Sequence, residues 1–173
     1  IAVFAHEPTT GDLTFVEVVR DGVNGVDGLY AAHSIAISPD GATLYAVGYL
    51  DSSLAVFSRD SVTGQLSFLE VFNDGVNGVN GLGTPYGVTV SPDGKHVYVA
   101  DGYYDDSVAL FNRDLSTGRL TFVEAISPRD ASFNKILDGA YTVRVSPDGL
   151  YVYVGTTYGD SLVVLGRDTV TGR

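Results

Sequence analysis

Apolar residues occur along this chain in short, strand-sized runs that are separated by polar turns. Residues 86–90 and 96–100 are two such runs, and they flank a Ser-Pro-Asp-Gly turn at 91–94. β-Branched and aromatic residues favour strands, whereas proline at the second turn position and glycine at the fourth favour a tight reversal. No stretch shows the 3.6-residue spacing of an amphipathic helix. The pattern predicts an all-β protein built from hairpins.

The same hairpin occurs three times. Its Ser-Pro-Asp-Gly turn lies at 38–41, 91–94 and 146–149, spaced by 53 and 55 residues, which indicates a repeat architecture. Each repeat also contains an apolar strand, a polar turn that ends in Thr-Gly, a second strand and a glycine-rich connection. Because residue 1 already lies inside a repeat, we expect a segment of a longer polypeptide. We predict one partial domain over 1–173, with repeats at 1–53, 54–107 and 108–161 and the start of a fourth at 162–173.

The four strands of each repeat are apolar at nearly every position, which favours sheets that are covered on both faces. Four-stranded sheets that pack face to face around an axis are the blades of a β-propeller. A linear β-solenoid is the alternative, but its rungs are much shorter than this period. We therefore predict a β-propeller of four-stranded antiparallel blades, with about three blades in an incomplete ring.

If the Ser-Pro-Asp-Gly hairpins form the inner strands, as the family resemblance given below implies, the chain holds the outer two strands of one blade, two complete blades and three strands of a fourth. Both ends would then expose strand edges and apolar faces. We expect the remaining blades of a longer chain, or another copy of this chain, to cover them.

The residues after each turn also resemble a known family. They are Val-Tyr-Val-Ala at 97–100, Leu-Tyr-Ala-Val at 44–47 and Val-Tyr-Val-Gly at 152–155. Together with the turns, they resemble the YVTN and lactonase-like (6-phosphogluconolactonase-like) β-propeller family over the whole chain. The resemblance implies the propeller fold. It leaves activity open, because related propellers include lactone hydrolases and non-enzymatic surface or binding proteins.

Charge and composition exclude several classes of partner. Twenty-one acidic residues against ten basic ones give a net charge of −11, which disfavours nucleic acid and anionic membrane surfaces. The chain has no cysteine, so disulfides and thiolate metal sites are impossible. Its longest apolar runs are too short to cross a bilayer, so we expect no membrane span. The acidic, cysteine-free composition favours a secreted or cell-surface protein.

Antiparallel strands place successive connections on alternate faces of a propeller. We call the face with the Ser-Pro-Asp-Gly and Thr-Gly turns the turn rim, and the opposite face the loop rim. The loop rim is expected to be acidic, with ten aspartates against three basic residues. The aspartates are Asp21, Asp27, Asp51, Asp74, Asp101, Asp105, Asp106, Asp130, Asp138 and Asp160, and the basic residues are Arg20, Arg129 and Lys135.

A calcium site is one hypothesis for the loop rim, because Ca²⁺ binds carboxylate, amide and carbonyl oxygens. The possible ligands are Asp21, Asn24 and Asp27 in the first repeat, with Asp74 and Asn77 in the second. The alternative is that these residues and the glycines beside them adopt left-handed turns and keep the connection soluble. No other cofactor is expected.

His33 is the histidine most suited to a functional role. His6 and His96 lie in or beside turns and are expected on the surface. His33 opens an inner strand at the loop rim, aligned with Tyr86 and Tyr141, where it would face the central channel. In lactonase-like propellers a histidine at this position is a recurring feature of the substrate pocket. The resemblance thus implies that His33 is a general base or positions the ligand, whereas packing beside the channel without catalysis is the alternative.

Arg144 lies in the corresponding inner strand of the third repeat. It could bind an anionic ligand through both guanidinium nitrogens or pair with Asp138, and we favour the ion pair. The Arg-Asp pairs at 59–60, 113–114 and 167–168 recur in each later turn, which predicts structural hydrogen bonds between blades or within the turns.

Tyrosines on the loop rim suggest a surface for carbohydrate, peptide or another small molecule, unless they pack between blades. They are Tyr30, Tyr49, Tyr103, Tyr104 and Tyr158.

Two functions are compatible with these patterns. The first is a segment of a larger propeller that acts as a binding or structural scaffold, with His33, Tyr86, Tyr141 and Arg144 lining its ligand site. The second is a lactone hydrolase in which His33 acts as general base or positions the substrate, and Arg144 binds an anion. The chain lacks a Gly-x-Ser-x-Gly motif and any cysteine, which disfavours catalysis by a nucleophilic side chain.

Overall fold

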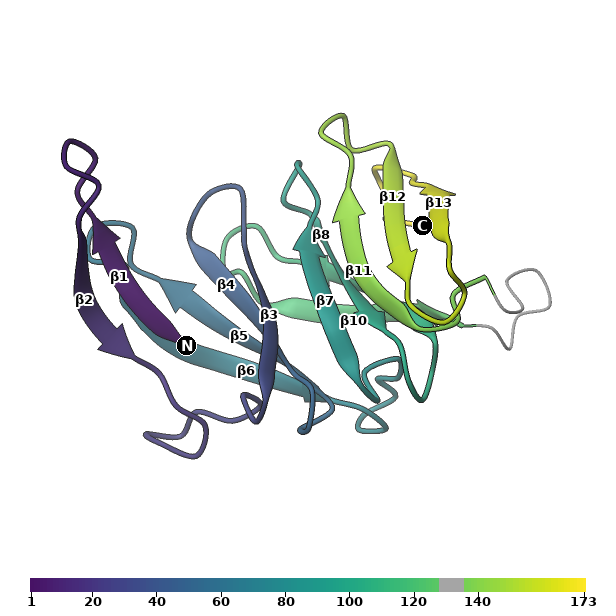
Figure 1. The fold of residues 1–173 in the computed structure, drawn as a ribbon, viewed down its shortest axis with the longest axis horizontal. Helices are drawn as coiled ribbons and strands as arrows, with labels where there is room; N and C mark the ends of the chain where they lie inside the picture. Colours follow the sequence, from purple (N-terminus) through teal and green to yellow (C-terminus); the bar gives the residue numbers. More distant parts are fainter. Residues whose placement is uncertain (128–135) are drawn as a thin grey trace.

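The computed structural model describes residues 1–127 and 136–173 (Figure 1). Thirteen strands occur in this part of the chain, and none of it forms a helix that could cross a membrane. The strands form four antiparallel sheets. The sheets are β1 (Ala2–His6) with β2 (Leu13–Val18); β3 (Ala32–Ile37), β4 (Thr43–Gly48), β5 (Ser53–Arg59) and β6 (Leu66–Asn73); β7 (Pro85–Val90), β8 (His96–Asp101), β9 (Ser107–Arg113) and β10 (Leu120–Ile126); and β11 (Ala140–Val145), β12 (Tyr151–Thr156) and β13 (Leu162–Gly166).

This arrangement is an incomplete β-propeller. The sheets hold two, four, four and three strands, which confirms the predicted distribution of outer strands, complete blades and an unfinished last blade. Figure 1 shows the sheets side by side from the N-terminal to the C-terminal end of the chain. The inner strands β3, β7 and β11 are neighbours, so their loop-rim ends meet at one place.

The core lies between the blades because the middle strands carry apolar side chains on both faces. Every residue of β4 and β8 is buried. Tyr45 and Val56 pack with Val97 and Phe111 between the two complete blades, and similar clusters lie on the outer side of each complete blade. Burial on both faces explains why these strands do not alternate between apolar and polar residues.

The Ser-Pro-Asp-Gly turns are held by a repeated set of hydrogen bonds. In the second of them the Gly94 amide donates to the Ser91 carbonyl at 2.8 Å, and the Ser91 hydroxyl donates to Asp93. Gly94 has a φ of 73°, a left-handed conformation that glycine adopts without strain. The predicted hairpin turn is therefore present with the residue types that its geometry requires.

Two arginines, Arg113 at the end of β9 and Arg167 directly after β13, join neighbouring blades. Arg113, in β9, donates to the Tyr45 hydroxyl at 2.8 Å, the Asp40 carboxylate at 2.8 Å and the Thr43 hydroxyl at 3.1 Å, all in the preceding blade. The next residue, Asp114, accepts the amides of Ser116 and Thr117 within its own turn. The recurrent Arg-Asp pairs are therefore structural, as predicted. Arg113 and Arg167 act between blades, Arg59 donates to the Gly41 carbonyl of its own blade, and the aspartates accept amides within their turns.

The expectation for His96 was wrong, whereas His6 is exposed as predicted. His96 is 2% exposed and lies within hydrogen-bond distance of Arg167 in the next blade, with Nδ1 2.6 Å from Nη2. Burial lowers the pKa of His96, and the neighbouring Arg167 charge lowers it further. The repeat alignment does not reveal that His96 is buried, because Thr43 occupies its position in the first hairpin. Thr43 accepts a hydrogen bond from Arg113, as His96 contacts Arg167 in the next blade.

The outer faces of the first and last blades expose apolar side chains, as predicted. Phe4, Ile35 and Ile37 are 50 to 53% exposed at the N-terminal side, and Leu162 and Val164 are 68 and 52% exposed at the C-terminal side. The two-stranded first sheet packs against only part of the second sheet, through residues such as Ile1 and Val19. The expectation that further blades or another copy of the chain cover these faces stays a prediction.

Candidate active site

His33, Tyr86 and Tyr141 lie near the beginning of the three adjacent inner strands. Each is at an irregularity in the pairing of its strand with the next one: the register shifts between Ala32 and Ser34, between Pro85 and Gly87, and between Ala140 and Thr142. Such bulges leave one residue unpaired and redirect its side chain. The three repeats thus use the same backbone feature to present one side chain each at the loop-rim end of the inner strands.

The three side chains contact one another. His33 Nδ1 lies 2.9 Å from the Tyr86 carbonyl oxygen, and the Tyr141 hydroxyl lies 3.1 Å from His33 Nε2. The ring centroids are 5.0 Å apart for His33 and Tyr86, 5.4 Å for His33 and Tyr141, and 4.6 Å for the two tyrosines. The sequence alignment had placed these residues together, and the structure shows that they form one cluster.

The hydrogen bonds select one tautomer of neutral His33. A carbonyl oxygen only accepts hydrogen bonds, so Nδ1 carries the proton that it donates to Tyr86. Nε2 then has a free electron pair, which accepts a hydrogen bond from the Tyr141 hydroxyl. The imidazole therefore presents its basic nitrogen to an exposed hydroxyl group, which is the arrangement that proton transfer requires.

Tyr86 keeps its phenolic proton across the neutral range. Burial raises its pKa to about 12, with further contributions from hydrogen bonding to Tyr49 and from the neighbouring hydroxyls of Tyr49, Tyr158 and Tyr141. The Tyr49 and Tyr86 ring centroids are 5.2 Å apart. Tyr86 is thus available as a hydrogen-bond donor. Sequence reasoning missed Tyr49 as part of this cluster, because it lies just after β4 rather than at the aligned position.

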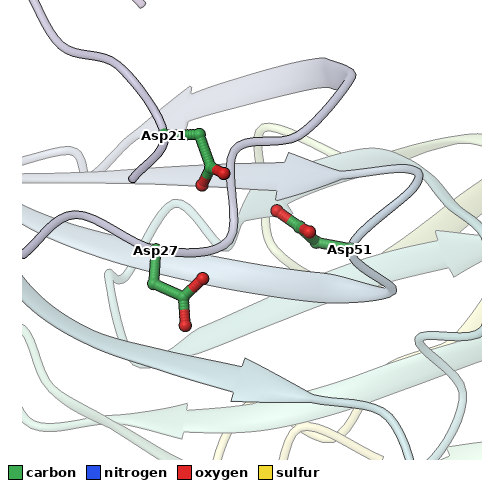
Figure 2. A group of neighbouring side chains, drawn as sticks. All are labelled: Asp21, Asp27 and Asp51. Carbon is green, nitrogen blue, oxygen red and sulfur yellow. The ribbon is translucent and has the colours of Figure 1, made fainter. Parts of the chain in front are cut away.

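A second polar group on the loop rim consists of Asp21, Asp27 and Asp51 (Figure 2). Each offers a carboxylate oxygen, and these oxygens lie within 4.8 Å of one another. Sequence reasoning proposed Asp21 and Asp27 as ligands but not Asp51, which follows β4 and is distant in the sequence. A close group of carboxylate oxygens is suited to a hard cation.

Each of these carboxylates also has a structural role. Asp21 accepts the Leu29 amide at 2.9 Å, Asp27 accepts the Gly28 amide at 3.0 Å, and Asp51 accepts the Tyr30 amide at 2.7 Å. These bonds close the glycine-rich connection. Calcium binding stays a prediction, which a Ca²⁺ titration followed by the melting temperature would test.

The second repeat uses the same loop closure. Asp74 accepts the Leu82 amide at 3.0 Å. Asn24 and Asn77 have φ values of 54° and 53°. Both therefore adopt the left-handed turn conformation that was the alternative to calcium binding for these loops.

Comparison with known proteins places this chain in a family. The family described as "Lactonase, 7-bladed beta-propeller" matches residues 1–127 of the chain. The chain belongs to this lactonase family. The match includes His33 and Tyr86, and the propeller fold agrees with it.

Three similar proteins illustrate the likeness. A relative from Arthroderma benhamiae named "Probable 6-phosphogluconolactonase" is 31% identical over 116 residues, which cover 64% of this chain and 26% of that protein. A structure from Bacteroides uniformis, described as a "putative 6-phosphogluconolactonase", has a TM-score of 0.75 at 22% identity and covers 99% of this chain and 45% of its own. The periplasmic gluconolactonase of Pseudomonas aeruginosa has a TM-score of 0.67 at 25% identity, covering 82% of this chain and 37% of its own. The chain thus spans only 26 to 47% of the length of the curated relatives that it matches.

Arg144 of this lactonase-family chain does not join the His33 cluster. It lies three residues beyond Tyr141 on β11, a distance of about 10 Å along a strand. Its Nη1 donates to the Val143 carbonyl at 2.7 Å. The predicted ion pair with Asp138 is wrong: the ion pairs found within 1–127 and 136–173 do not include it, because Asp138 precedes β11 and Arg144 lies near its opposite end.

The remaining loop-rim residues divide into exposed and buried groups. Tyr30, Tyr103, Tyr104 and Tyr158 are exposed and do not pack between blades. Asp101, in contrast, is fully buried, and burial raises its pKa to about 6. Three charged residues of the predicted loop rim lie outside the described residues: Arg129, Asp130 and Lys135.

Proposed function

We propose that this chain supplies acid-base groups to a lactone hydrolase, the second of the two functions suggested by the sequence. The observation that carries the proposal is the pair of contacts from His33, with Nδ1 at the Tyr86 carbonyl and Nε2 at the Tyr141 hydroxyl. Membership of the lactonase family and the names of its relatives support hydrolysis over a purely structural scaffold. The exposed position of His33 and Tyr141 leaves both accessible to a small molecule.

Lactone hydrolysis needs a base, a water molecule and a donor for the carbonyl oxygen. In the proposed reaction His33 Nε2, directly or through the Tyr141 hydroxyl, accepts a proton from water as the water oxygen attacks the lactone carbonyl carbon. The Nδ1 bond to Tyr86 stabilises the imidazolium that forms. The His33 imidazolium then gives this proton to the lactone ring oxygen as the bond between that oxygen and the carbonyl carbon breaks. The products are the hydroxy acid and neutral His33.

Tyr86 is suited to the third role. Its hydroxyl, whose pKa is raised to about 12, keeps its proton at the pH of the reaction and would turn from Tyr49 to the lactone carbonyl oxygen. A neutral donor stabilises the negative charge that develops on the carbonyl oxygen in the tetrahedral intermediate. Such a contact is stronger in the transition state than in the bound substrate, so it accelerates the reaction.

The proposed substrate class is the lactone of a sugar acid, in keeping with the names of the relatives. Arg144 lies too far along β11 to contact the reacting carbonyl. Its proposed role is therefore to bind a phosphate or carboxylate at the distant end of a substrate that extends along the channel.

The test is hydrolysis of glucono-δ-lactone by the intact protein. We expect His33→Asn to lower kcat/KM by roughly 100-fold or more, because general base catalysis typically contributes that much. His6→Asn, on the exposed end of β1, is the matched control and is expected to retain full activity. Full activity of His33→Asn would contradict the proposal, and a wild-type protein that binds but does not hydrolyse lactones would favour the scaffold.

A further inference from the structure

A serine at the start of the third strand occurs in three repeats, and one copy differs from the others in its hydrogen bonds. It is Ser53 in β5, Ser107 in β9 and Ser161 directly before β13. The Ser53 hydroxyl donates to the Gly28 carbonyl at 3.0 Å, and the Ser161 hydroxyl lies 2.9 Å from the Thr156 hydroxyl. The Ser107 hydroxyl is buried and has no hydrogen-bond partner among the described residues. A buried hydroxyl without a partner is costly, so it points to a missing ligand.

The residue that pairs with this serine on the neighbouring strand explains the difference. Gly48 pairs with Ser53, and a β-carbon at Gly48 would lie only 2.9 Å from the serine hydroxyl oxygen. Asp101 pairs with Ser107 in the next blade. Its two carboxylate oxygens accept the Thr84 amide at 2.8 Å and the Thr84 hydroxyl at 3.0 Å. The glycine thus leaves its serine room for a hydrogen bond, whereas the aspartate turns to Thr84 and leaves Ser107 without one.

Ser107 lines a pocket of about 270 Å³ at the loop-rim ends of β9 and β10. The described residues that line it are Asn80, Gly81, Asp105, Ser107, Ala125 and Ser127. Four of these side chains carry oxygen: a carboxylate, an amide and two hydroxyls. A β-carbon at Gly81 would lie 2.7 Å from the Ser107 hydroxyl oxygen, so the glycine keeps this oxygen accessible from the pocket.

Negative charge gathers beside this pocket. The point where a β-carbon at Gly83 would lie is 3.0 Å from Asp105 Oδ2 and 3.5 Å from Asp101 Oδ2. Asp101 is fully buried, and Asp105 is half-buried. The ion pairs found in residues 1–127 and 136–173 include neither of these carboxylates. A cation in the pocket would offset the repulsion between them.

We propose that this pocket binds Ca²⁺ through the Asp105 carboxylate, the Asn80 amide oxygen and the Ser107 hydroxyl oxygen. Ca²⁺ binds about six to eight oxygen ligands in flexible geometry and takes some of them from water, which suits a mixed set of side chains from separate segments. Asp101 contributes charge but is not a ligand, because both of its oxygens bond to Thr84.

The ion has a structural role that a hydrogen bond fills in the blade of β3 to β6. There the Ser53 hydroxyl ties the glycine-rich connection to β5 through the Gly28 carbonyl. In the blade of β7 to β10 the ion ties the corresponding connection, which carries Asn80, to the start of β9. The site lies on the outer strands β9 and β10, away from the inner strand that carries His33, so it does not depend on lactone hydrolysis.

The test is a Ca²⁺ titration of protein that carries Asp51→Asn. This change removes one carboxylate of the group with Asp21 and Asp27, and the new amide oxygen can still accept the Tyr30 amide. Calorimetry at neutral pH is expected to show saturable binding. Free Ca²⁺ at about 100 times Kd is expected to raise Tm by roughly 5 °C or more.

Variants in this background locate the site. Asp105→Asn is expected to lower Ca²⁺ affinity by about 100-fold and Ser107→Ala by about 10-fold, because each removes a ligand. Ser53→Ala is the matched control and should leave the affinity unchanged. Without Ca²⁺ the two serine changes should differ in the opposite sense. Ser53→Ala lowers Tm because a hydrogen bond is lost, whereas Ser107→Ala leaves Tm unchanged or raises it because an unpaired hydroxyl is removed.

Four results would overturn the proposal. They are no Ca²⁺ binding by the Asp51→Asn protein, unchanged affinity after Asp105→Asn, unchanged affinity after Ser107→Ala, and a loss after Ser53→Ala as large as that after Ser107→Ala. If Ser107→Ala does not fold, Asn80→Ala replaces it, because Asn80 is exposed. It is expected to lower the affinity by about 10-fold, and unchanged affinity would again overturn the proposal.

Discussion

Arg113 has a side chain that is 1% exposed, yet its guanidinium donates to four hydrogen-bond acceptors. It donates to a tyrosine, a threonine, an aspartate and a backbone carbonyl, so its charge is buried with acceptors on all sides. The residue pattern predicted that this arginine was structural but not which atoms it would meet. The three side-chain partners are 68 to 73 residues away in the sequence, and no local rule identifies them.

Replacement of Arg113 measures the strength of this contact. We expect Arg113→Ala to lower the free energy of unfolding by roughly 2 to 4 kcal/mol, because the change leaves buried acceptors without a donor. Arg119→Ala is the control: Arg119 forms an ion pair with Glu70 but is 51% exposed, so its loss should cost less than about 1 kcal/mol. Urea denaturation of both variants tests this, and equal losses would contradict it.

Asp101 gives the protein a pH dependence of known sign. Burial raises its pKa from 3.8 to about 6 in the folded protein, and the nearby Asp105 charge adds to the shift. Between these values the unfolded chain loses the proton first, so stability falls as pH rises through this range, by an amount of order 2 to 3 kcal/mol.

The variant Asp101→Asn should largely remove this decline. Its side chain still accepts the Thr84 amide and donates to the Thr84 hydroxyl, which replaces the two bonds of the carboxyl. Urea midpoints measured between pH 4 and pH 7 test the prediction. A decline of unchanged size in the variant would show that other groups cause it.

At the scale of strands and turns, the bulges decide where the candidate site lies. The sequence alignment placed His33 with Tyr86 and Tyr141, because all three open an inner strand. The alignment could not show that each lies at a bulge, since bulges depend on the pairing with the next strand. It also missed Tyr49, which directly follows β4 and lies beside Tyr86.

The Thr-Gly turns allow a test of packing between blades. Gly11 and Gly118 both have left-handed φ values, +80° and +74°, so alanine strains the backbone equally at the two positions. Added methyl groups differ in surroundings: at Gly11 nothing lies within 4 Å, whereas at Gly118 the methyl would overlap Thr43 of the preceding blade.

We therefore expect Gly11→Ala to cost about 1 kcal/mol and Gly118→Ala roughly 3 kcal/mol or more. Thermal denaturation of the two variants checks the difference. Similar losses would mean that this turn does not press against its neighbour in solution.

At the scale of the whole molecule, the repeat period was sufficient to predict the fold. The period, the number of strands in it and their apolar character specify four-stranded sheets covered on both faces, and the strand order follows from which hairpin is innermost. The function was harder to predict than the fold. The sequence patterns favoured a scaffold, whereas membership of the lactonase family favours hydrolysis. Charge patterns misled at single residues: His96 and Asp101 lie beside turns or loops but are buried in contacts between strands.

The most direct test of the account is the protonation of His33 with and without a bound sugar acid. The chain has three histidines, so variants of His6 and His96 assign their ring nitrogen resonances in ¹⁵N NMR spectra of the intact protein. The account predicts that neutral His33 carries its proton on Nδ1 and that added gluconate, the product of gluconolactone hydrolysis, shifts the His33 resonances but not those of His6. A proton on Nε2, or His33 resonances that do not change with gluconate, would contradict it.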